Sequence, residues 1–220
     1  MAAKTRIDAV VFDLGGVLVQ IARGWNDAHR LAGLADDHPM LDAEAFHERS
    51  AAAAHGYQTG AISFDEWAEA VAEASEGAYS TEEAKRIMEA WTIEEYPGIR
   101  AVIDAIHDAG LATAALSNTN QRHWELLGAH DESYADYPNL GAIQQLHASH
   151  ILGHAKPDAA IFDAFVEAAD LKKARVLFFE DTKPNVDAAR RYGWAARHID
   201  YAGDPAAQMM AALRHHRVID

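Results

Sequence analysis

Cysteine is absent from the chain, so disulfide bonds and thiolate chemistry are both excluded. This absence is compatible with a reducing compartment, and we expect a cytoplasmic protein. Positive charge is also scarce, because 19 Lys and Arg residues stand against 34 Asp and Glu residues, for a formal net charge of −15. An acidic surface repels polyanions, so we expect neither nucleic acid nor an anionic membrane as a partner.

The chain also lacks internal repeats, low-complexity tracts and any apolar run of membrane-spanning length. Its first six residues lead directly into a strand-like run, so we expect no secretory signal. What the chain has is length and apolar content, with 220 residues of which 50% are hydrophobic. These values suit one sizeable core, or a core with a smaller inserted unit.

Short apolar runs alternate with helix-like stretches through much of the chain. The predicted strands cover residues 7–12, 111–116, 142–147, 176–179 and 195–199. The predicted helices between the later strands cover residues 99–109, 160–169 and 185–192. Alternating strands and helices predict an α/β fold with a Rossmann-like parallel sheet and right-handed crossovers.

Residues 18–97 interrupt this alternation. They hold only helix-like stretches, at 25–34, 41–54, 64–75 and 81–91. Ser63 and Ser80 are each followed three residues later by a glutamate, a capping-box spacing that predicts two helix starts. We therefore predict an α/β core of residues 1–17 and 98–220 and an all-helical cap domain of residues 18–97. Such a cap would lie over the carboxyl edge of the sheet as a substrate-selecting lid, the alternative being a purely stabilising domain.

The first predicted strand ends in a single carboxylate, Asp13, which is followed by Leu14, Gly15 and Gly16. A carboxylate at the end of a buried strand can cap a helix, bind a metal or act as a nucleophile. Because position 15 is glycine, no second carboxylate follows two residues later.

Two further polar motifs come after predicted strands. Ser117 and Asn118 follow the strand at 111–116, where they would either bind an anion or cap the next helix. Lys156 precedes Pro157, which we expect to begin a helix and so to fix the lysine backbone. Each of these signals is weak when taken alone.

Glu180 and Asp181 directly follow the apolar strand at 176–179. Adjacent carboxylates at the end of a buried strand are costly unless a positive charge lies beside them. Mg²⁺ prefers oxygen ligands and is the natural partner for such a pair. All four motifs are predicted at the carboxyl ends of parallel strands, which meet at one edge of the sheet.

The order of these motifs, Asp13, Ser117, Lys156 and then Glu180-Asp181, resembles the haloacid dehalogenase superfamily of phosphatases and related hydrolases. The resemblance extends over nearly the whole chain, because residues 18–97 look like the helical cap of that family. The residues of the first two motifs are similar to those of bacterial sugar phosphatases of the glucose-1-phosphate type. The resemblance implies a phosphatase that hydrolyses a small phosphate monoester, such as a sugar phosphate.

The resemblance also implies roles for the residues that bind and attack phosphate. Asp13 would be the nucleophile that forms a phosphoaspartate, which water then hydrolyses. Ser117, Asn118 and Lys156 would bind the phosphoryl oxygens, and Lys156 would also offset the charge of Asp13.

Magnesium is the cofactor that the resemblance implies. Its ligands would be the Asp13 carboxylate, the Gly15 backbone carbonyl and Asp181, while Glu180 would orient a metal-bound water. A metal-independent 2-haloacid dehalogenase is the alternative enzyme of the same fold, since a halide leaves without a proton. Glu180 and Asp181 count against this alternative because they would repel an anionic haloacid.

Most phosphatases of the resembled family carry an aspartate at the place of Gly15, where it acts as general acid and then as general base. Loss of such a group costs about 10²–10⁴ in rate. The substrate could have a readily expelled leaving group, or His47, His55 or His123 could supply the proton. A third reading is a catalytically weak protein that mainly binds a sugar phosphate.

The predicted cap is expected to set specificity. Trp25, His47 and Tyr57 are the candidates for its cleft-facing side chains, and buried packing is the alternative for the two aromatic residues.

Overall fold

A five-stranded parallel sheet forms the centre of the molecule, in the strand order β5-β4-β1-β6-β7. The computed structural model describes residues 7–35, 43–171 and 175–220. The strands are β1 (Ala9–Phe12), β4 (Ala112–Ser117), β5 (Gln145–Ala148), β6 (Val176–Glu180) and β7 (Ala195–His198). They correspond to the five predicted strands with small shifts at their ends, and the predicted α/β parallel-sheet core is confirmed.

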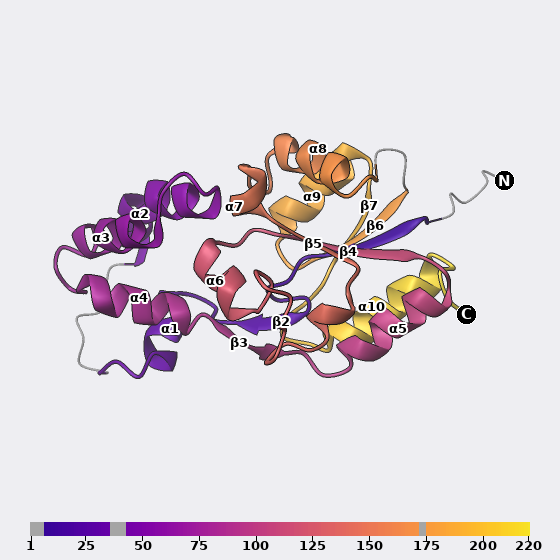
Figure 1. The fold of residues 1–220 in the computed structure, drawn as a ribbon, viewed down its shortest axis with the longest axis horizontal. Coiled ribbons are helices and arrows are strands. Elements are labelled where there is room, and N and C mark those ends of the chain that lie inside the picture. Colours follow the sequence, from indigo (N-terminus) through magenta and orange to yellow (C-terminus); the bar gives the residue numbers. More distant parts are fainter. Residues whose placement is uncertain (1–6, 36–42, 172–174) are drawn as a thin grey trace.

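Helices cover both faces of this sheet, as Figure 1 shows. The helices α5 (Ile99–Asp108) and α10 (Pro205–His215) lie on one face, and α8 (Ala159–Ala168) and α9 (Lys183–Tyr192) lie on the other. Because side chains alternate along a strand, β1 contributes Val10 and Phe12 to one apolar cluster and Val11 to the other. The central strand is therefore buried on both faces, which is typical of parallel sheets.

The helix predictions for 99–109, 160–169 and 185–192 are confirmed by α5, α8 and α9. The structure adds α10, two short helices, α6 (Gln121–Leu126) and α7 (Ser149–Leu152), and a 3₁₀ turn, η1 (Leu140–Ala142). The expectation that Pro157 begins a helix is wrong. The helix α8 starts at Ala159, and Asp158 has the extended backbone of an N-cap residue.

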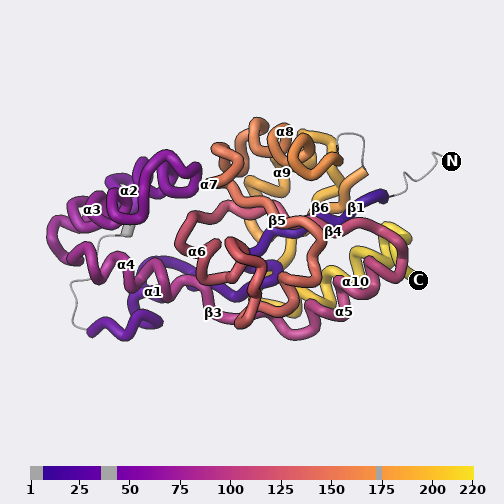
Figure 2. The backbone as a smooth tube through the Cα atoms, viewed as in Figure 1, coloured from indigo at the N-terminus to yellow at the C-terminus, as the bar shows by residue number. Residues whose placement is uncertain are grey.

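Four helices form a separate layer beside the sheet edge (Figure 2). They are α1 (Trp25–Leu31), α2 (Ala43–Gln58), α3 (Phe64–Ala74) and α4 (Thr81–Glu89). The predicted capping boxes at Ser63 and Ser80 are both present, and each serine side chain accepts a hydrogen bond from the backbone N–H three residues later. The predicted start of the second helix at residues 41–42 lies outside the described residues.

A two-stranded antiparallel ribbon joins these helices to the core, formed by β2 (Val19–Ile21) and β3 (Thr92–Glu95). The prediction that residues 18–97 hold only helices is therefore wrong. The two strands are too short and too exposed to show the alternating pattern of a half-buried strand, and β3 ends in two glutamates. Their pairing depends on residues more than seventy positions apart, which local pattern cannot reveal.

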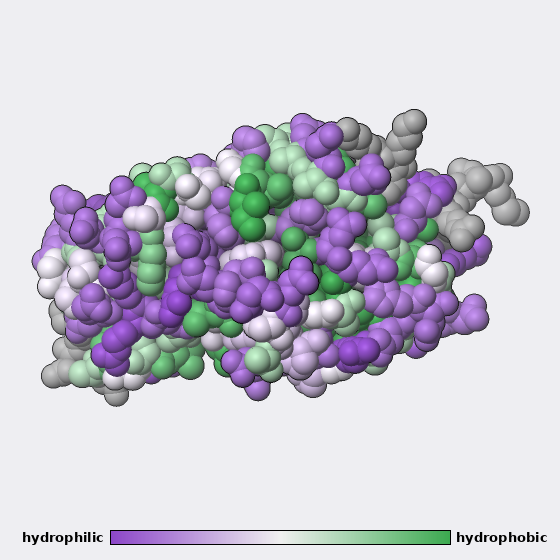
Figure 3. Space-filling model, in the orientation of Figure 1, coloured by the Kyte–Doolittle hydropathy of each residue, from purple (hydrophilic) through white to green (hydrophobic). Residues whose placement is uncertain are grey.

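Hydrophilic residues cover most of the face shown in Figure 3, with a small hydrophobic patch over α7. Ile151 in α7 is 64% exposed. Isolated exposed apolar residues of this kind are ordinary on protein surfaces. Among the described residues, the helices lack the combination of length and apolar character that crossing a membrane requires.

Candidate functional site

The predicted motifs meet at the carboxyl edge of the sheet because β1 lies between β4 and β6. Phe12, the last residue of β1, pairs with Ala115 of β4 on one side and with Phe179 of β6 on the other. This register brings Asp13, Ser117 and Glu180 to the same edge. Lys156 reaches the edge from the loop between α7 and α8.

Lys156 is the buried cation of this site, and its side chain has no exposed area. Its Nζ atom lies 3.0 Å from Asp13 Oδ1 and donates hydrogen bonds to Glu180 Oε2 at 2.7 Å and to the Leu116 carbonyl at 2.8 Å. Burial by itself would lower the pKa of Lys156, but the adjacent carboxylates of Asp13 and Glu180 raise it. The ammonium group is therefore held in its charged form.

Asp13 lies in a strongly perturbed environment. Burial and the neighbouring charge of Glu180 raise the pKa of Asp13 to about 7, although Lys156 acts in the opposite direction. One buried ammonium group does not fully offset the carboxylates around it. A further cation at this place would favour the ionised form of Asp13, which is the form that a nucleophile needs.

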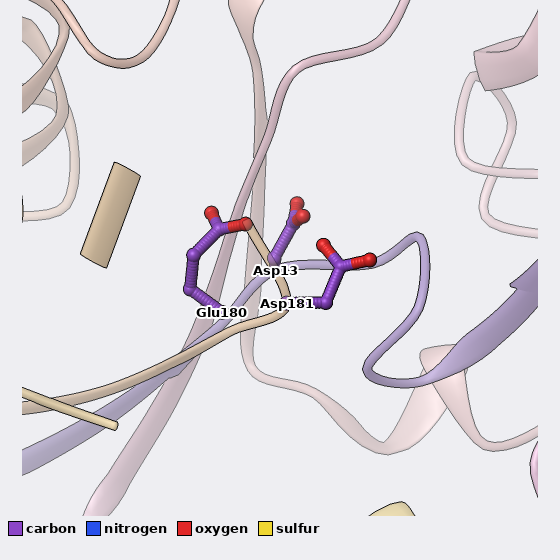
Figure 4. Close-up of side chains that lie close together, drawn as sticks. All are labelled: Asp13, Glu180 and Asp181. Atoms are coloured by element: carbon purple, nitrogen blue, oxygen red, sulfur yellow. The ribbon is translucent and has the colours of Figure 1, made fainter. Parts of the chain in front are cut away.

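The carboxylates of Asp13, Glu180 and Asp181 point to the same side of the sheet edge (Figure 4). Each offers one oxygen within 4.8 Å of the other two, and within the described parts of the chain this is the one such group. A donor set made only of oxygen atoms fits a hard cation such as Mg²⁺. The residues present thus fit the metal that the resemblance implied.

The oxygens of Glu180 are already engaged within the protein. Oε2 accepts the hydrogen bond from Lys156, and Oε1 accepts one from the Thr182 backbone N–H at 2.9 Å. Glu180 therefore fixes the lysine and the turn after β6. The Glu180 side chain also has no exposed area, whereas those of Asp13 and Asp181 are 11% and 10% exposed, so these two are the better placed for direct contact with a metal ion.

The turn after Asp13 is shaped by two glycines. A Cβ atom on Gly15 would lie 2.9 Å from Ile21 Cδ1, so Ile21 fills the space into which a side chain at position 15 would project. Gly16 has a φ of 77°, and a Cβ atom there would overlap the Asp181 carboxylate. Glycine at position 16 therefore permits the close approach of Asp181 to this turn.

Asn118 holds the lysine loop against the end of β4. Its Nδ2 donates to the Lys156 carbonyl at 2.8 Å, and its Oδ1 accepts from the Lys156 backbone N–H at 2.8 Å. This reciprocal pair occupies the side-chain amide, so its direct effect is to position Lys156. Ser117 is buried and lines the cleft next to Gly15.

A cleft of about 290 Å³ lies between the sheet edge and the four helices. The cap side of this cleft is largely apolar, and its larger side chains are those of Trp25, Phe46, Trp67, Met88 and Trp91. Among the described residues that line it, none is Asp, Glu, Lys or Arg. The cap therefore contributes mainly shape and apolar contact, while the core side of the cleft is lined by the polar residues that follow β4.

Of the three cap residues expected to face the cleft, two line it and one does not. Trp25 and His47 line the cleft, as expected, although Trp25 also packs 4.9 Å from the ring of Phe46. Tyr57 is not among the residues that line this cleft. It is 2% exposed and stacks on Trp67 at 5.7 Å, which agrees with the alternative of buried packing.

The structure also separates the three histidines that could replace the missing acid. His55 is exposed and is not among the lining residues of the cleft. His123 lines the cleft, but its Nε2 donates to the Met88 carbonyl at 2.8 Å, and burial lowers the pKa of His123 to about 4. His123 is therefore neutral near pH 7, which leaves His47 as the remaining candidate that lines the cleft.

Arg23 is a residue of this site that no sequence pattern marks. Its Nη1 lies 2.9 Å from Asp181 Oδ2, and its guanidinium carbon lies 3.4 Å from the centroid of the Tyr201 ring. Arg23 follows β2 in the segment that leads to the cap. Only the folded chain brings this segment to the end of β6.

A family model for haloacid dehalogenase-like hydrolases matches residues 7–193. The chain belongs to this family. The match includes all four motifs at the sheet edge and the helical insertion.

Individual relatives are similar over most of their length. A D-ribitol-5-phosphate phosphatase of Bacteroides thetaiotaomicron is 26% identical, and the match covers 94% of this chain and 98% of the relative. A solved structure of a HAD family enzyme from the same organism has a TM-score of 0.73 at 18% identity, covering 91% of this chain and 97% of that enzyme. An L-2-haloacid dehalogenase of Xanthobacter autotrophicus has a TM-score of 0.61 at 18% identity, covering 88% and 77% of the two chains. Likeness at this level of identity shows a shared fold.

We predict that His123 makes the protein less stable in mild acid. Because its pKa is lowered from 6.5 to about 4 in the folded state, the unfolded chain binds a proton first as the pH falls. Stability is then lost between about pH 6.5 and pH 4, by roughly 2 kcal/mol at pH 5. Thermal unfolding of His123→Gln, which keeps a donor for the Met88 carbonyl, should show a flatter dependence on pH than the wild type.

The exposed His55→Gln variant is the matched control, and it should follow the wild-type curve. An unchanged pH dependence in His123→Gln would contradict the assignment of a neutral, buried His123.

Proposed function

We propose that the protein is a magnesium-dependent phosphatase that hydrolyses a small phosphate monoester of the sugar-phosphate type through a phosphoaspartate on Asp13. The observation that carries this proposal is the cluster of Asp13, Glu180 and Asp181, in which the buried ammonium group of Lys156 contacts Asp13 and Glu180. The D-ribitol-5-phosphate phosphatase similar to this chain supports the substrate class. The HAD family enzyme of Bacteroides thetaiotaomicron has also been solved with magnesium and inorganic phosphate, at a TM-score of 0.67.

The carboxylates of Asp13 and Asp181, with the backbone carbonyl of Gly15, would hold the magnesium ion. When bound, magnesium supplies positive charge that offsets the Asp13 carboxylate and the phosphoryl oxygens. Glu180 keeps Lys156 in place and, through the Thr182 backbone N–H, fixes the turn that carries Asp181.

In the first step, a carboxylate oxygen of Asp13 attacks phosphorus, and the bond between phosphorus and the leaving-group oxygen breaks. Lys156 and Ser117 bind the phosphoryl oxygens, and Asn118 contributes by holding the Lys156 backbone. In the second step, water attacks phosphorus and the bond between phosphorus and the Asp13 oxygen breaks, which releases inorganic phosphate and restores the carboxylate. The proton that the water loses returns to the histidine that protonated the leaving group in the first step.

The proton for the leaving group would come from His47. This histidine and His123 are the two described histidines that line the cleft, and His123 is held neutral by its burial. His47 is exposed on α2 at the cap side of the cleft, where the organic part of a substrate would lie. In its charged form it can donate a proton to the oxygen that leaves.

A halide-releasing reaction is not part of this proposal. A haloacid carries its own carboxylate, and the clustered carboxylates of Asp13, Glu180 and Asp181 would repel it. A cytoplasmic location and a small phosphorylated metabolite as the partner complete the proposal, supported by the absence of cysteine and the net charge of −15.

We predict that Asp13→Asn abolishes turnover of phosphate esters, with a loss of about 10⁴-fold or more, because the amide cannot attack phosphorus. Inorganic phosphate should still bind, since Lys156 and Ser117 remain. A magnesium-supplemented panel of sugar 1- and 6-phosphates provides the activity measurement. Asp108→Asn, on the exposed end of α5, is the control. Turnover retained by Asp13→Asn would exclude Asp13 as the nucleophile.

The role of His47 predicts a dependence on the leaving group. His47→Gln should lower kcat roughly 10²-fold for an alkyl phosphate, whose alkoxide needs a proton. The same variant should act almost normally on p-nitrophenyl phosphate, whose phenolate leaves unprotonated. His55→Gln, on the same helix, should match the wild type on both substrates. Equal losses on both substrates would instead indicate a role for His47 in binding alone.

An acidic side chain can be introduced at position 15 if the Ile21 side chain beside it is shortened. Gly15→Asp combined with Ile21→Ala removes the side chain that fills this space. In a His47→Gln background, this pair should restore alkyl phosphate turnover by roughly tenfold or more, because an acid again faces the leaving group. Ile21→Ala by itself should restore nothing. Failure of the combined variant to gain activity while it still binds phosphate would argue against protonation as the missing step.

A further inference from the structure

Arg23 lies in the hinge, the two chain segments of residues 19–24 and 92–97 that attach the cap to the core. Its Nη2 donates to the Tyr96 hydroxyl at 3.3 Å, and that hydroxyl donates to the Tyr201 carbonyl at 3.3 Å. Tyr96 follows β3, and Arg23 follows β2, so one guanidinium group contacts both chain segments that connect the cap with the core. Its face also stacks on the ring of Tyr201 in the core.

The same guanidinium group is bonded to a proposed metal ligand. Arg23 Nη1 donates to Asp181 Oδ2 at 2.9 Å, and Asp181 Oδ1 accepts a hydrogen bond from the Thr182 hydroxyl at 3.2 Å. Both oxygens of Asp181 therefore have partners within the chain. A cation that binds Asp181 must share an oxygen with one of them.

The charges of the site are divided between two cations. Lys156 contacts Asp13 and Glu180, whereas Arg23 contacts Asp181. The Asp181 side chain is 10% exposed and that of Arg23 is 28% exposed, so solvent screens this pair only in part. A divalent cation at Asp181 would place two positive groups side by side, and their repulsion would weaken the contact with Arg23.

Gly16 shows that the contact depends on a close approach of three groups. A Cβ atom at this position would overlap the Asp181 carboxylate and would lie 2.9 Å from Arg23 Nη2. Three segments therefore pack directly against one another: the loop at Gly16, the turn after β6 at Asp181, and the hinge at Arg23. Asp181 thus contacts the hinge directly, through the Arg23 side chain.

We propose that Arg23 is a positioning residue that competes with magnesium for Asp181 and so couples the metal site to the hinge of the cap. The inference rests on the proposed function, which assigns magnesium to Asp181. Without magnesium, Arg23 holds Asp181 and ties both connecting segments to the core. With magnesium bound, the guanidinium group is displaced from Asp181, and the ribbon of β2 and β3 is less restrained.

The first test measures magnesium binding to the full chain by titration calorimetry without substrate. Arg23→Gln removes the competing charge, so it should bind magnesium roughly fivefold or more tightly than the wild type. Arg23→Lys keeps the charge and should stay closer to the wild type. Arg30→Gln, on α1 and paired with Asp27, is the control and should leave the affinity unchanged. Equal or weaker affinity in Arg23→Gln would overturn the competition.

The second test measures hydrogen exchange in residues 19–21 and 92–95. Magnesium should accelerate exchange of this ribbon in the wild type, because the Arg23 contact is released, and should have little effect in Arg23→Gln. An identical response to magnesium in the two proteins would overturn the coupling.

Failure of the proposed function has a different signature. If neither the wild type nor Arg23→Gln binds magnesium, the metal site itself is wrong and both proposals fall. If both bind magnesium with equal affinity, and Asp181→Ala does not bind it, only the role of Arg23 is overturned.

Discussion

The charged contact of Lys156 with Asp13 and Glu180 is the interaction on which the rest of the site depends. A fully buried ammonium group is tolerated only when its charge and its hydrogen bonds are matched. Lys156 meets this requirement with groups at the ends of three adjacent strands: Asp13 after β1, the Leu116 carbonyl in β4 and Glu180 in β6. The same side chain thus ties the ends of three strands together. Its single positive charge does not fully offset the carboxylates around Asp13, so the site favours an additional cation.

The cap acts on this site through contacts of different kinds. His123 of α6 bonds to the Met88 carbonyl of the cap as a neutral donor, and Arg23 connects the hinge to Asp181 by a charged contact. The cleft between cap and core is apolar on the cap side and polar on the core side. This division matches a substrate with a charged phosphate at one end and a less polar part at the other. Under the proposed function, recognition and chemistry lie on separate parts of the chain.

Much of the core was predictable because its signals are local. Five apolar runs, the glycines that end helices and the capping boxes at Ser63 and Ser80 all act within a few residues. The ribbon of β2 and β3 was not predictable, because its strands are stabilised by each other rather than by their own pattern. The predicted helix start at Pro157 was wrong, because α8 starts two residues later, at Ala159. The engagement of the Asn118 amide with Lys156 depends on a contact between residues 38 positions apart.

The sequence by itself determined which chemistry is available: a carboxylate, a hydroxyl, a lysine and an acidic pair, each at the end of a strand, with glycine in place of a second acid. These features follow from residue identity and from spacing along the chain. The tertiary structure decided which groups touch, because strand order, hinge position and burial are set by contacts between distant segments. It placed His47 and His123 at the cleft and His55 away from it, filled the space beside Gly15 with Ile21, and brought Arg23 to Asp181.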